Sequence, residues 1–354
     1  MSQQEIILNS VDKLFNTNIN NYIFVYTPPK VGSTTLVTSL RLSLGKTHNI
    51  IHIHDEVMLN VLTGINNVKI NDIINYLANI GKKVYVIDVY RTPIERKMSE
   101  FFEKISPYHF NNTEQNINNY SFERVNNRFN KLFPHLENGD HYFDKYNICN
   151  IIPFDFNIKY TIQEQNGISY IKFRLCDSHL WKDFLSLIFK TEVVLISDYK
   201  TETKCIGNLY KKFKNEYKLP INFFEIIKQC KFFNFYYNEV ERNEYLNIWK
   251  NKLCNIFIPY SDSEYKFYIN LCFENQYIND IKTEHYIDNG CFCELCNDKR
   301  KEIQSKAKIG ETKFEKISHQ KLVINKQKKN IQLRMQNNKN NKFTNNQFKI
   351  NLLL

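Results

Sequence analysis

The stretch that decides the fold is YIFVYTPPKVGSTTL, residues 22–36. Its opening residues YIFVYT are apolar or β-favouring and predict a buried strand. From Gly32 the apolar residues follow the spacing of a helix, which we expect to end near Gly45. The intervening loop therefore carries the chain from the end of a strand to the N-terminus of a helix.

The alternation of strand and helix continues along the chain. Further strands are predicted at residues 49–55, 82–91 and 192–199, helices at 69–81, 93–105, 121–133 and 178–189, a hairpin at 159–175, and an all-helical region at 205–255. Strands that alternate with helices form parallel sheets joined by right-handed crossovers. The sequence thus predicts an α/β fold with a parallel sheet flanked by helices and a helical C-terminal region.

The net charge of +11 is confined to the C-terminal tail. Residues 297–354 contain fifteen Lys and Arg against four Asp and Glu, whereas residues 1–296 contain thirty-three of each sign. The body therefore has no overall field that attracts polyanions. The Lys-, Asn- and Gln-rich tail is compatible with contact to a polyanion such as nucleic acid, an anionic membrane surface or an acidic glycan, but we expect it to be solvated and largely disordered.

Other features of the chain indicate an intracellular protein, cytoplasmic or otherwise. No stretch reaches the roughly 20 apolar residues of a membrane span, and residues 1–21 lack the pattern of a signal peptide. The nine Cys are an odd number, and six of them are scattered singly. Free, buried thiols in a reducing compartment fit this distribution better than a disulfide framework does.

The loop at residues 27–36 has the composition of a phosphate site. Gly32 permits a tight turn, the amides of Ser33, Thr34 and Thr35 open the helix, and Lys30 adds a positive charge. The order of residues is not that of a Walker A loop, because here the Lys precedes the Gly. The alternative is an ordinary strand-to-helix turn whose Ser and Thr only cap the helix.

A second candidate segment, YRTPIERKMSEFF, begins at the end of another predicted strand, at residues 90–102. Arg91 leaves the strand at the edge where parallel sheets bind ligands, and Ser99 follows about two helical turns later. Arg offers a planar fork of donors to a phosphate, and Ser offers a hydroxyl. Alternatively, Arg91 and Arg96 belong to a solvated start of a helix.

Together the two segments resemble the cofactor motifs of sulfotransferases that use 3′-phosphoadenosine 5′-phosphosulfate (PAPS). In that superfamily a P-K-x-G-[ST]-[ST] loop holds the 5′-phosphosulfate, and an R-x-P-x-x-R-x-x-S segment holds the 3′-phosphate. The resemblance implies a P-loop-like sheet, with Lys30, Gly32, Ser33, Thr34 and Thr35 in the first role. The second role falls to Arg91 and Ser99, and Pro29 and Pro93 also match. More loosely, the layout through HYFDKYNI (141–148), the hairpin, the Leu-Pro pair at Pro220 and the aromatic helices resembles the capsular polysaccharide synthesis proteins, a sulfotransferase-like group. This resemblance implies a carbohydrate acceptor.

On this interpretation the chain divides into four parts. They are an N-terminal lead-in (1–21), a sulfotransferase-like domain (22–260) that contains an inserted acceptor-side segment (107–140), a C-terminal extension with a Cys cluster (261–296), and the basic tail (297–354).

Sulfuryl transfer needs a cation beside the developing charge and a base for the acceptor hydroxyl. Lys30 is the candidate cation, and His54 in IIHIHDE is the candidate base. Asp55 and Glu56 remain open as bases. The other interpretations of His52 and His54 are histidines satisfied by the backbone, or an H-x-H pair that binds a metal.

A cluster of possible zinc ligands precedes the tail. Its members are Cys291, Cys293 and Cys296 in CFCELC, with His285 upstream. Three thiolates and one imidazole can complete a tetrahedral zinc site. The spacing matches no zinc finger, and reduced surface thiols are the alternative.

Two other functions compete with a sulfotransferase. A kinase would use the same loop with a nucleoside triphosphate, but only Asp88 ends a strand where a magnesium ligand is needed. A binding protein would keep the nucleotide or glycan site without turnover.

Overall fold

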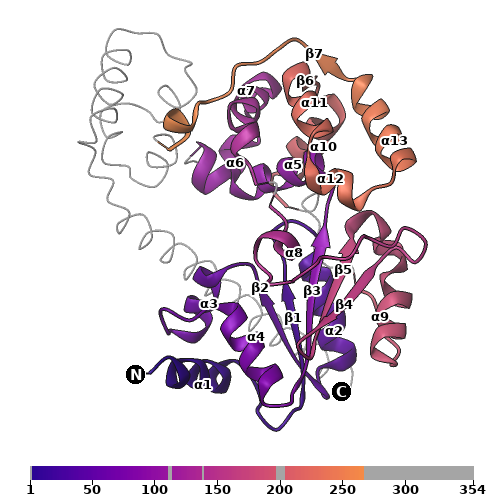
Figure 1. Ribbon diagram of the computed structural model, residues 1–354. Helices are drawn as coiled ribbons and strands as arrows, with labels where there is room; N and C mark the ends of the chain where they lie inside the picture. The colour runs from indigo at the N-terminus through magenta and orange to yellow at the C-terminus, as the bar shows by residue number, and fades with distance from the viewer. Residues whose placement is uncertain (1, 111–113, 138, 197–203, 267–354) are drawn as a thin grey trace, which may run out of the picture.

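The computed structural model describes residues 2–110, 114–137, 139–196 and 204–266. A five-stranded sheet forms the centre of the lower lobe (Figure 1), in the order β2-β1-β3-β5-β4. All neighbours are parallel except β4, which runs antiparallel to β5 at one edge. The strands are β1 (Asn21–Tyr26), β2 (His48–Ile53), β3 (Lys83–Tyr90), β4 (Thr161–Gln165) and β5 (Ile168–Arg174). The predicted α/β fold is confirmed as a mostly parallel sheet flanked by helices.

The position of each strand explains its pattern of residues. The two strands β1 and β3 lie inside the sheet and are covered on both faces, so their side chains are buried almost without interruption. The edge strand β4 alternates between more and less exposed side chains. Its hairpin with β5 turns at Asn166 and Gly167, where φ is +52° and +75°. Positive φ at both central residues is the requirement of a type I′ turn, which the Asn-Gly pair predicted.

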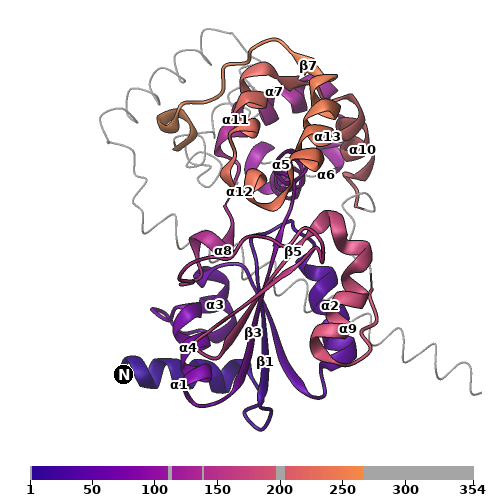
Figure 2. The same cartoon turned by 45° about the vertical axis from the view of Figure 1, so that its right-hand side comes forward.

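Helices cover both faces of this sheet (Figure 2). One face carries α2 and α9, and the other carries α1, α3 and α4. These helices are α1 (Gln3–Leu14), α2 (Ser33–Leu44), α3 (Glu56–Thr63), α4 (Ile70–Asn79) and α9 (Trp181–Phe189). The sequence analysis missed α1, although Ser2 and Glu5 form a capping box at its start.

The strand predicted at residues 192–199 is wrong over residues 192–196, and the rest of that range lies outside the described residues. The backbone amide of Val194 donates to Ser43 Oγ, and that of Ile196 donates to Ser39 Oγ, both at 2.9 Å. These two serines belong to α2. The segment therefore satisfies its backbone donors on a helix instead of on a neighbouring strand.

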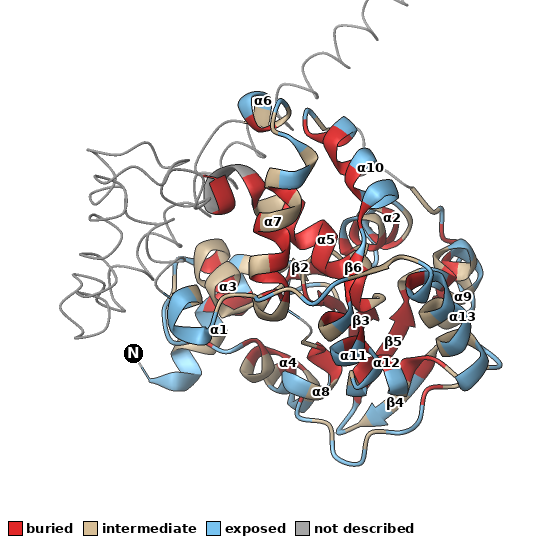
Figure 3. Ribbon diagram, turned by 90° about the horizontal axis from the view of Figure 1, so that it is seen from above, coloured by how far each residue is buried: buried red, intermediate tan, exposed pale blue. Residues whose placement is uncertain are grey.

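A second lobe of helices lies over the carboxyl ends of the strands (Figure 1). Its helices are α5 (Pro93–Lys104), α6 (Glu114–Ile117), α7 (Phe122–Leu132), α10 (Gly207–Glu216), α11 (Ile221–Lys228), α12 (Lys231–Tyr236) and α13 (Glu239–Lys250), with a short pairing of β6 (Leu219–Pro220) and β7 (Leu253–Cys254). Seen from above, α5 is buried near the middle of the molecule (Figure 3). The prediction that residues 205–255 are helical is confirmed, except for the short pairing of β6 with β7.

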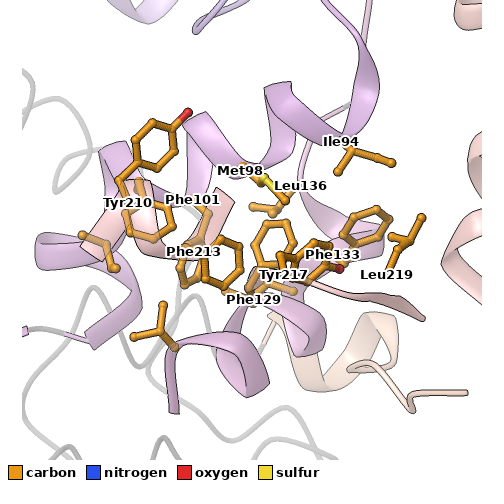
Figure 4. Close-up of a cluster of buried hydrophobic side chains, with 14 of the residues drawn as sticks. Ile94, Met98, Phe101, Phe129, Phe133, Leu136, Tyr210, Phe213, Tyr217 and Leu219 are labelled. Carbon is orange, nitrogen blue, oxygen red and sulfur yellow. The ribbon is translucent and has the colours of Figure 1, made fainter. Parts of the chain in front are cut away.

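Aromatic side chains fill this helical lobe. Phe101 of α5, Phe129 of α7 and Phe213 of α10 meet in one cluster (Figure 4). Residues 107–140 and residues 206–253 both contribute to it, so the segment that looked like an insertion is part of the same core. The aromatic run at residues 221–237 is also mainly core: Phe223, Phe233 and their neighbours are buried.

A buried lysine joins α5 to the end of α7. Lys97 Nζ donates to the carbonyl oxygens of Phe133 at 2.8 Å and Leu136 at 2.5 Å, and its side chain is fully buried. Burial lowers the pKa of Lys97 to about 8. The two carbonyls need this donor, because they lie where α7 gives way to a single turn of 3-10 helix and their helical partners run out.

A buried ion cluster joins the sheet to the helical lobe. Lys172 Nζ of β5 lies 2.7 Å from Asp88 Oδ2 of β3 and 2.5 Å from Asp140 Oδ2. Tyr236 of α12 donates to the other oxygen of Asp140 at 3.1 Å. Burial raises the pKa of Asp140 to about 6, although Lys172 opposes the shift. Two carboxylates thus share one lysine at the junction.

Two features of the described residues bear on the cell compartment that the sequence predicts. Among the described residues, no helix is long and apolar enough to cross a membrane. Five described cysteines are free thiols. The expectation that they are buried is wrong, because Cys149, Cys176 and Cys205 are exposed and the other two are half-buried.

Candidate functional site

The phosphate-type loop lies at the carboxyl end of β1, facing the helical lobe. Gly32 caps α2 with φ +87°, and Lys30 also has a positive φ of +68°. A Cβ on Gly32 would lie 2.8 Å from Leu175 Cδ1 and 3.1 Å from the Trp181 ring. Both the backbone angle and the close approach therefore require glycine. The amides of the first turn of α2 follow this residue, as a phosphate-binding loop needs.

Arg91 brings the end of β3 to this loop. Its Nη1 donates to the carbonyl oxygen of Lys30 at 2.9 Å. The two segments that the sequence analysis singled out, about 60 residues apart in the chain, are therefore in direct contact. The bond uses one of the five N–H donors of the guanidinium. It also holds Lys30 in its left-handed backbone conformation.

Two further charged residues, Glu103 and Lys204, lie at this edge, and their sequence context did not identify them as site residues. Glu103 of α5 accepts from Lys30 Nζ at 3.1 Å and from Lys204 Nζ at 2.5 Å. Burial alone would raise the pKa of Glu103, but Lys30 and Lys204 together lower it to about 2. Burial lowers the pKa of Lys30, and Glu103 opposes that shift. The edge thus holds Lys30 and Lys204 on one carboxylate, with Arg91 close to Lys30.

Ser99 lies one helical turn before Glu103 on α5. Residues four apart project from the same side of a helix, so Ser99 is on the side of α5 that carries the contact to Lys30. Its side chain is buried. Ser99 therefore shares the Glu103 side of α5, and its side chain is shielded from solvent.

Three histidines line the neighbouring strand end. His52 Nε2 lies 2.9 Å from Ser33 Oγ, and the rings of His52 and His54 meet edge to face with centroids 4.5 Å apart. His54 Nδ1 donates to the carbonyl oxygen of Thr27 at 2.6 Å. His141 Nε2 donates to the carbonyl oxygen of His54 at 2.7 Å. Both candidate histidines therefore contact the loop itself, and His141 is a third that the sequence analysis missed.

These contacts fix the chemistry that His54 can perform. Because Nδ1 carries the proton in its bond to Thr27, the neutral ring has its lone pair on Nε2. A base with that lone pair accepts a proton at Nε2. The alternative base Asp55 is engaged elsewhere, since its carboxylate caps α3 by accepting from the Met58 amide at 2.7 Å.

Metal binding has little support within the part of the chain that the structure describes. There, no group of three or more His, Cys, Asp or Glu side chains is arranged to hold a metal ion. Asp88, the magnesium ligand that a kinase would need, is fully buried and paired with Lys172. The predicted zinc ligands Cys291, Cys293, Cys296 and His285, like the basic tail, lie outside the described residues.

Comparisons with protein-family models, with curated proteins and with solved structures found no match to this chain. The case for a function therefore depends on the motifs and on the contacts described above.

Proposed function

We propose that the protein is a sulfotransferase-like enzyme that transfers a sulfuryl group from PAPS to a hydroxyl group, most plausibly of a carbohydrate. One observation carries the proposal: the Arg91 guanidinium, at the end of β3, bonds to the backbone of the loop that ends β1. A ligand with phosphates at two ends needs two anion sites a short distance apart. The contact supports such a pair, on a sheet edge that we take to be P-loop-like.

The 5′-phosphosulfate would lie over the loop. The amides of Gly32, Ser33, Thr34 and Thr35 open α2 and point toward an anion at its N-terminus. Lys30 supplies a cation at the same position. The 3′-phosphate would meet the remaining donors of Arg91 and the hydroxyl of Ser99.

The residues of this chain would then serve the transfer as follows. Bound PAPS supplies an activated sulfuryl group. Lys30 and the helix amides stabilise the negative charge that grows on the leaving phosphate oxygen as its bond to sulfur breaks. His54 Nε2 accepts the proton of the acceptor hydroxyl as its oxygen bonds to sulfur. Glu56, in the first turn of α3, stays open as an alternative base.

The carbohydrate acceptor rests on the resemblance to capsular polysaccharide synthesis proteins. We place it beside His54, the candidate base, at the carboxyl ends of the strands, over which the helical lobe lies (Figure 2). An assay with a panel of glycans identifies the acceptor.

The buried pairing of Asp88 weighs against a kinase. A magnesium ligand has to reach the nucleotide phosphates, whereas this carboxylate is held by Lys172 beneath the surface. The remaining alternative is a protein that binds a nucleotide or glycan without turnover.

Calorimetry with 3′-phosphoadenosine 5′-phosphate (PAP) and with ATP tests the proposal. We expect PAP to bind more tightly than ATP, and Lys30→Ala to weaken PAP binding at least about tenfold, as loss of a charged contact does. Lys228→Ala is the matched control, since it removes an exposed lysine from α11. Tighter binding of ATP would overturn the assignment.

Transfer of labelled sulfate from PAPS to a panel of glycans separates an enzyme from a binding protein. His54→Gln should retain PAP binding and lose about a hundredfold or more of the transfer rate. If His54→Gln keeps full activity, then the base is another residue. Binding of PAP with no transfer to any acceptor would favour the binding protein.

A further inference from the structure

The carboxylate of Glu103 occupies an unusual position at the proposed site. A single oxygen, Oε2, accepts from Lys30 at 3.1 Å and from Lys204 at 2.5 Å. Two lysines that converge on one oxygen form the arrangement that binds a phosphate or sulfate oxygen. The three side chains keep 13%, 27% and 22% of their surface exposed, for Lys30, Glu103 and Lys204 respectively. A dissolved anion can therefore reach them.

Two positive side chains meet one carboxylate oxygen here. Two lysines face one carboxylate, and Arg91 stands close enough to act on the charge of Lys30. Lys30 and Lys204 lower the pKa of Glu103 to about 2, so its carboxylate is charged at neutral pH. An incoming oxyanion therefore meets a carboxylate that already binds both lysines.

We propose that Lys204 belongs to the anion site, and that Glu103 is an internal anion which a ligand oxyanion displaces from between Lys30 and Lys204. The ligand class is a diphosphate or phosphosulfate group, which presents several oxygens to two cations. The identity of that ligand as a nucleotide rests on the proposed function, whereas the displacement does not.

This arrangement has two physical consequences. First, Glu103 holds both lysine side chains in place before a ligand arrives, so less side-chain entropy is lost on binding. Second, the ligand has to compete with a carboxylate, which lowers its apparent affinity. Because 27% of the Glu103 side chain is exposed, this flexible side chain can turn further toward solvent when a stronger anion enters.

The decisive variant is Glu103→Gln, which keeps the shape and removes the competing charge. We expect the variant to bind inorganic pyrophosphate about tenfold more tightly than the wild-type chain in calorimetry at low salt. Glu225→Gln is the control, because it makes the same chemical change in an exposed Lys-Glu pair on α11. Binding by Glu103→Gln within twofold of the wild type, or weaker, would overturn the displacement.

The part played by Lys204 is tested separately. Lys204→Met should weaken pyrophosphate binding about tenfold, whereas Lys228→Met should leave it unchanged. In the wild-type chain, saturating pyrophosphate should also slow acetylation of Lys204, measured by mass spectrometry. If neither effect is seen, then Lys204 is not in the anion site. The acetylation measurement uses the wild-type chain, so it does not depend on the folding of any variant.

The two proposals fail in different ways. If Glu103→Gln tightens pyrophosphate binding but PAP is not preferred to ATP, then the displacement stands and the sulfotransferase assignment falls. If PAP is preferred to ATP and Glu103→Gln has no effect on pyrophosphate binding, then the sulfotransferase assignment stands and the displacement falls.

Discussion

Replacement of Gly32 by Ala probes the loop at its most constrained point. The residue has φ +87°, and an added methyl group would lie 2.8 Å from Leu175 Cδ1 and 3.1 Å from Trp181. Real Cβ atoms essentially never come within 3.0 Å of another heavy atom. The loop, the Leu175 side chain or the Trp181 ring therefore has to move.

The expected cost has two parts. An L-residue in the left-handed region loses about 1–2 kcal/mol relative to glycine. Forcing a methyl group into a packed contact adds about 1–3 kcal/mol. Together they lower the free energy of unfolding by about 2–5 kcal/mol, a large share of the roughly 5–15 kcal/mol of a typical domain.

Gly64→Ala separates these two parts. Gly64 has a similar positive φ of +68°, but a methyl group there would meet no atom within 4 Å. Urea unfolding should show a loss of only about 1–2 kcal/mol for this control. Gly32→Ala should also lose PAP binding, whereas Gly64→Ala should keep it. Equal losses of stability in the two variants, with PAP binding intact in both, would refute the reasoning.

Three further predictions concern other parts of the chain. Lys97→Met should lower the free energy of unfolding by about 2–4 kcal/mol in urea unfolding, because the carbonyls of Phe133 and Leu136 lose their donor; a loss below about 1 kcal/mol, as expected for Lys228→Met, would contradict this. Burial raises the folded-state pKa of Asp140 to about 6, above its unfolded value. The wild type should therefore lose stability relative to Asp140→Asn as pH rises from 4 to 6. A difference in stability that stays constant with pH would exclude such a shift. If Cys291, Cys293, Cys296 and His285 bind zinc, the purified full chain should contain about one equivalent by elemental analysis, and less than about half an equivalent counts against the site.

The strands of the sheet could be predicted from the sequence because most of them are strongly apolar and end at clear signals. The Asn166-Gly167 turn is the best example, since its backbone angles are almost forced by these two residues. The strand predicted at residues 192–199 failed over its described part. Val193 and Leu195 pack against the core, yet the amides of Val194 and Ile196 bond to α2 serines, which no local pattern indicates.

The motif residues of the site could be predicted from the sequence, but the contacts of Glu103 with Lys30 and Lys204 could not. Lys30, Gly32 and Arg91 stand in recognisable spacings at strand ends. Glu103 and Lys204 lie 101 residues apart, and only the packing of α5 against the chain before α10 brings them together. Nothing in their local sequence distinguishes them from surface charges. His141 could not be predicted for the same reason, because its contact with the carbonyl oxygen of His54 joins residues that lie 87 positions apart in the chain.

The most direct test of the central claim compares PAP with adenosine 5′-phosphate, two ligands that differ only in the 3′-phosphate. The wild-type chain should bind PAP about tenfold to a hundredfold more tightly, as one or two charged contacts to that group provide. Arg91→Lys, which keeps the charge but loses the planar fork, should remove most of that preference. Equal affinity of the wild-type chain for the two ligands would contradict a site built from the β1 loop and Arg91 for a nucleotide with phosphates at both ends.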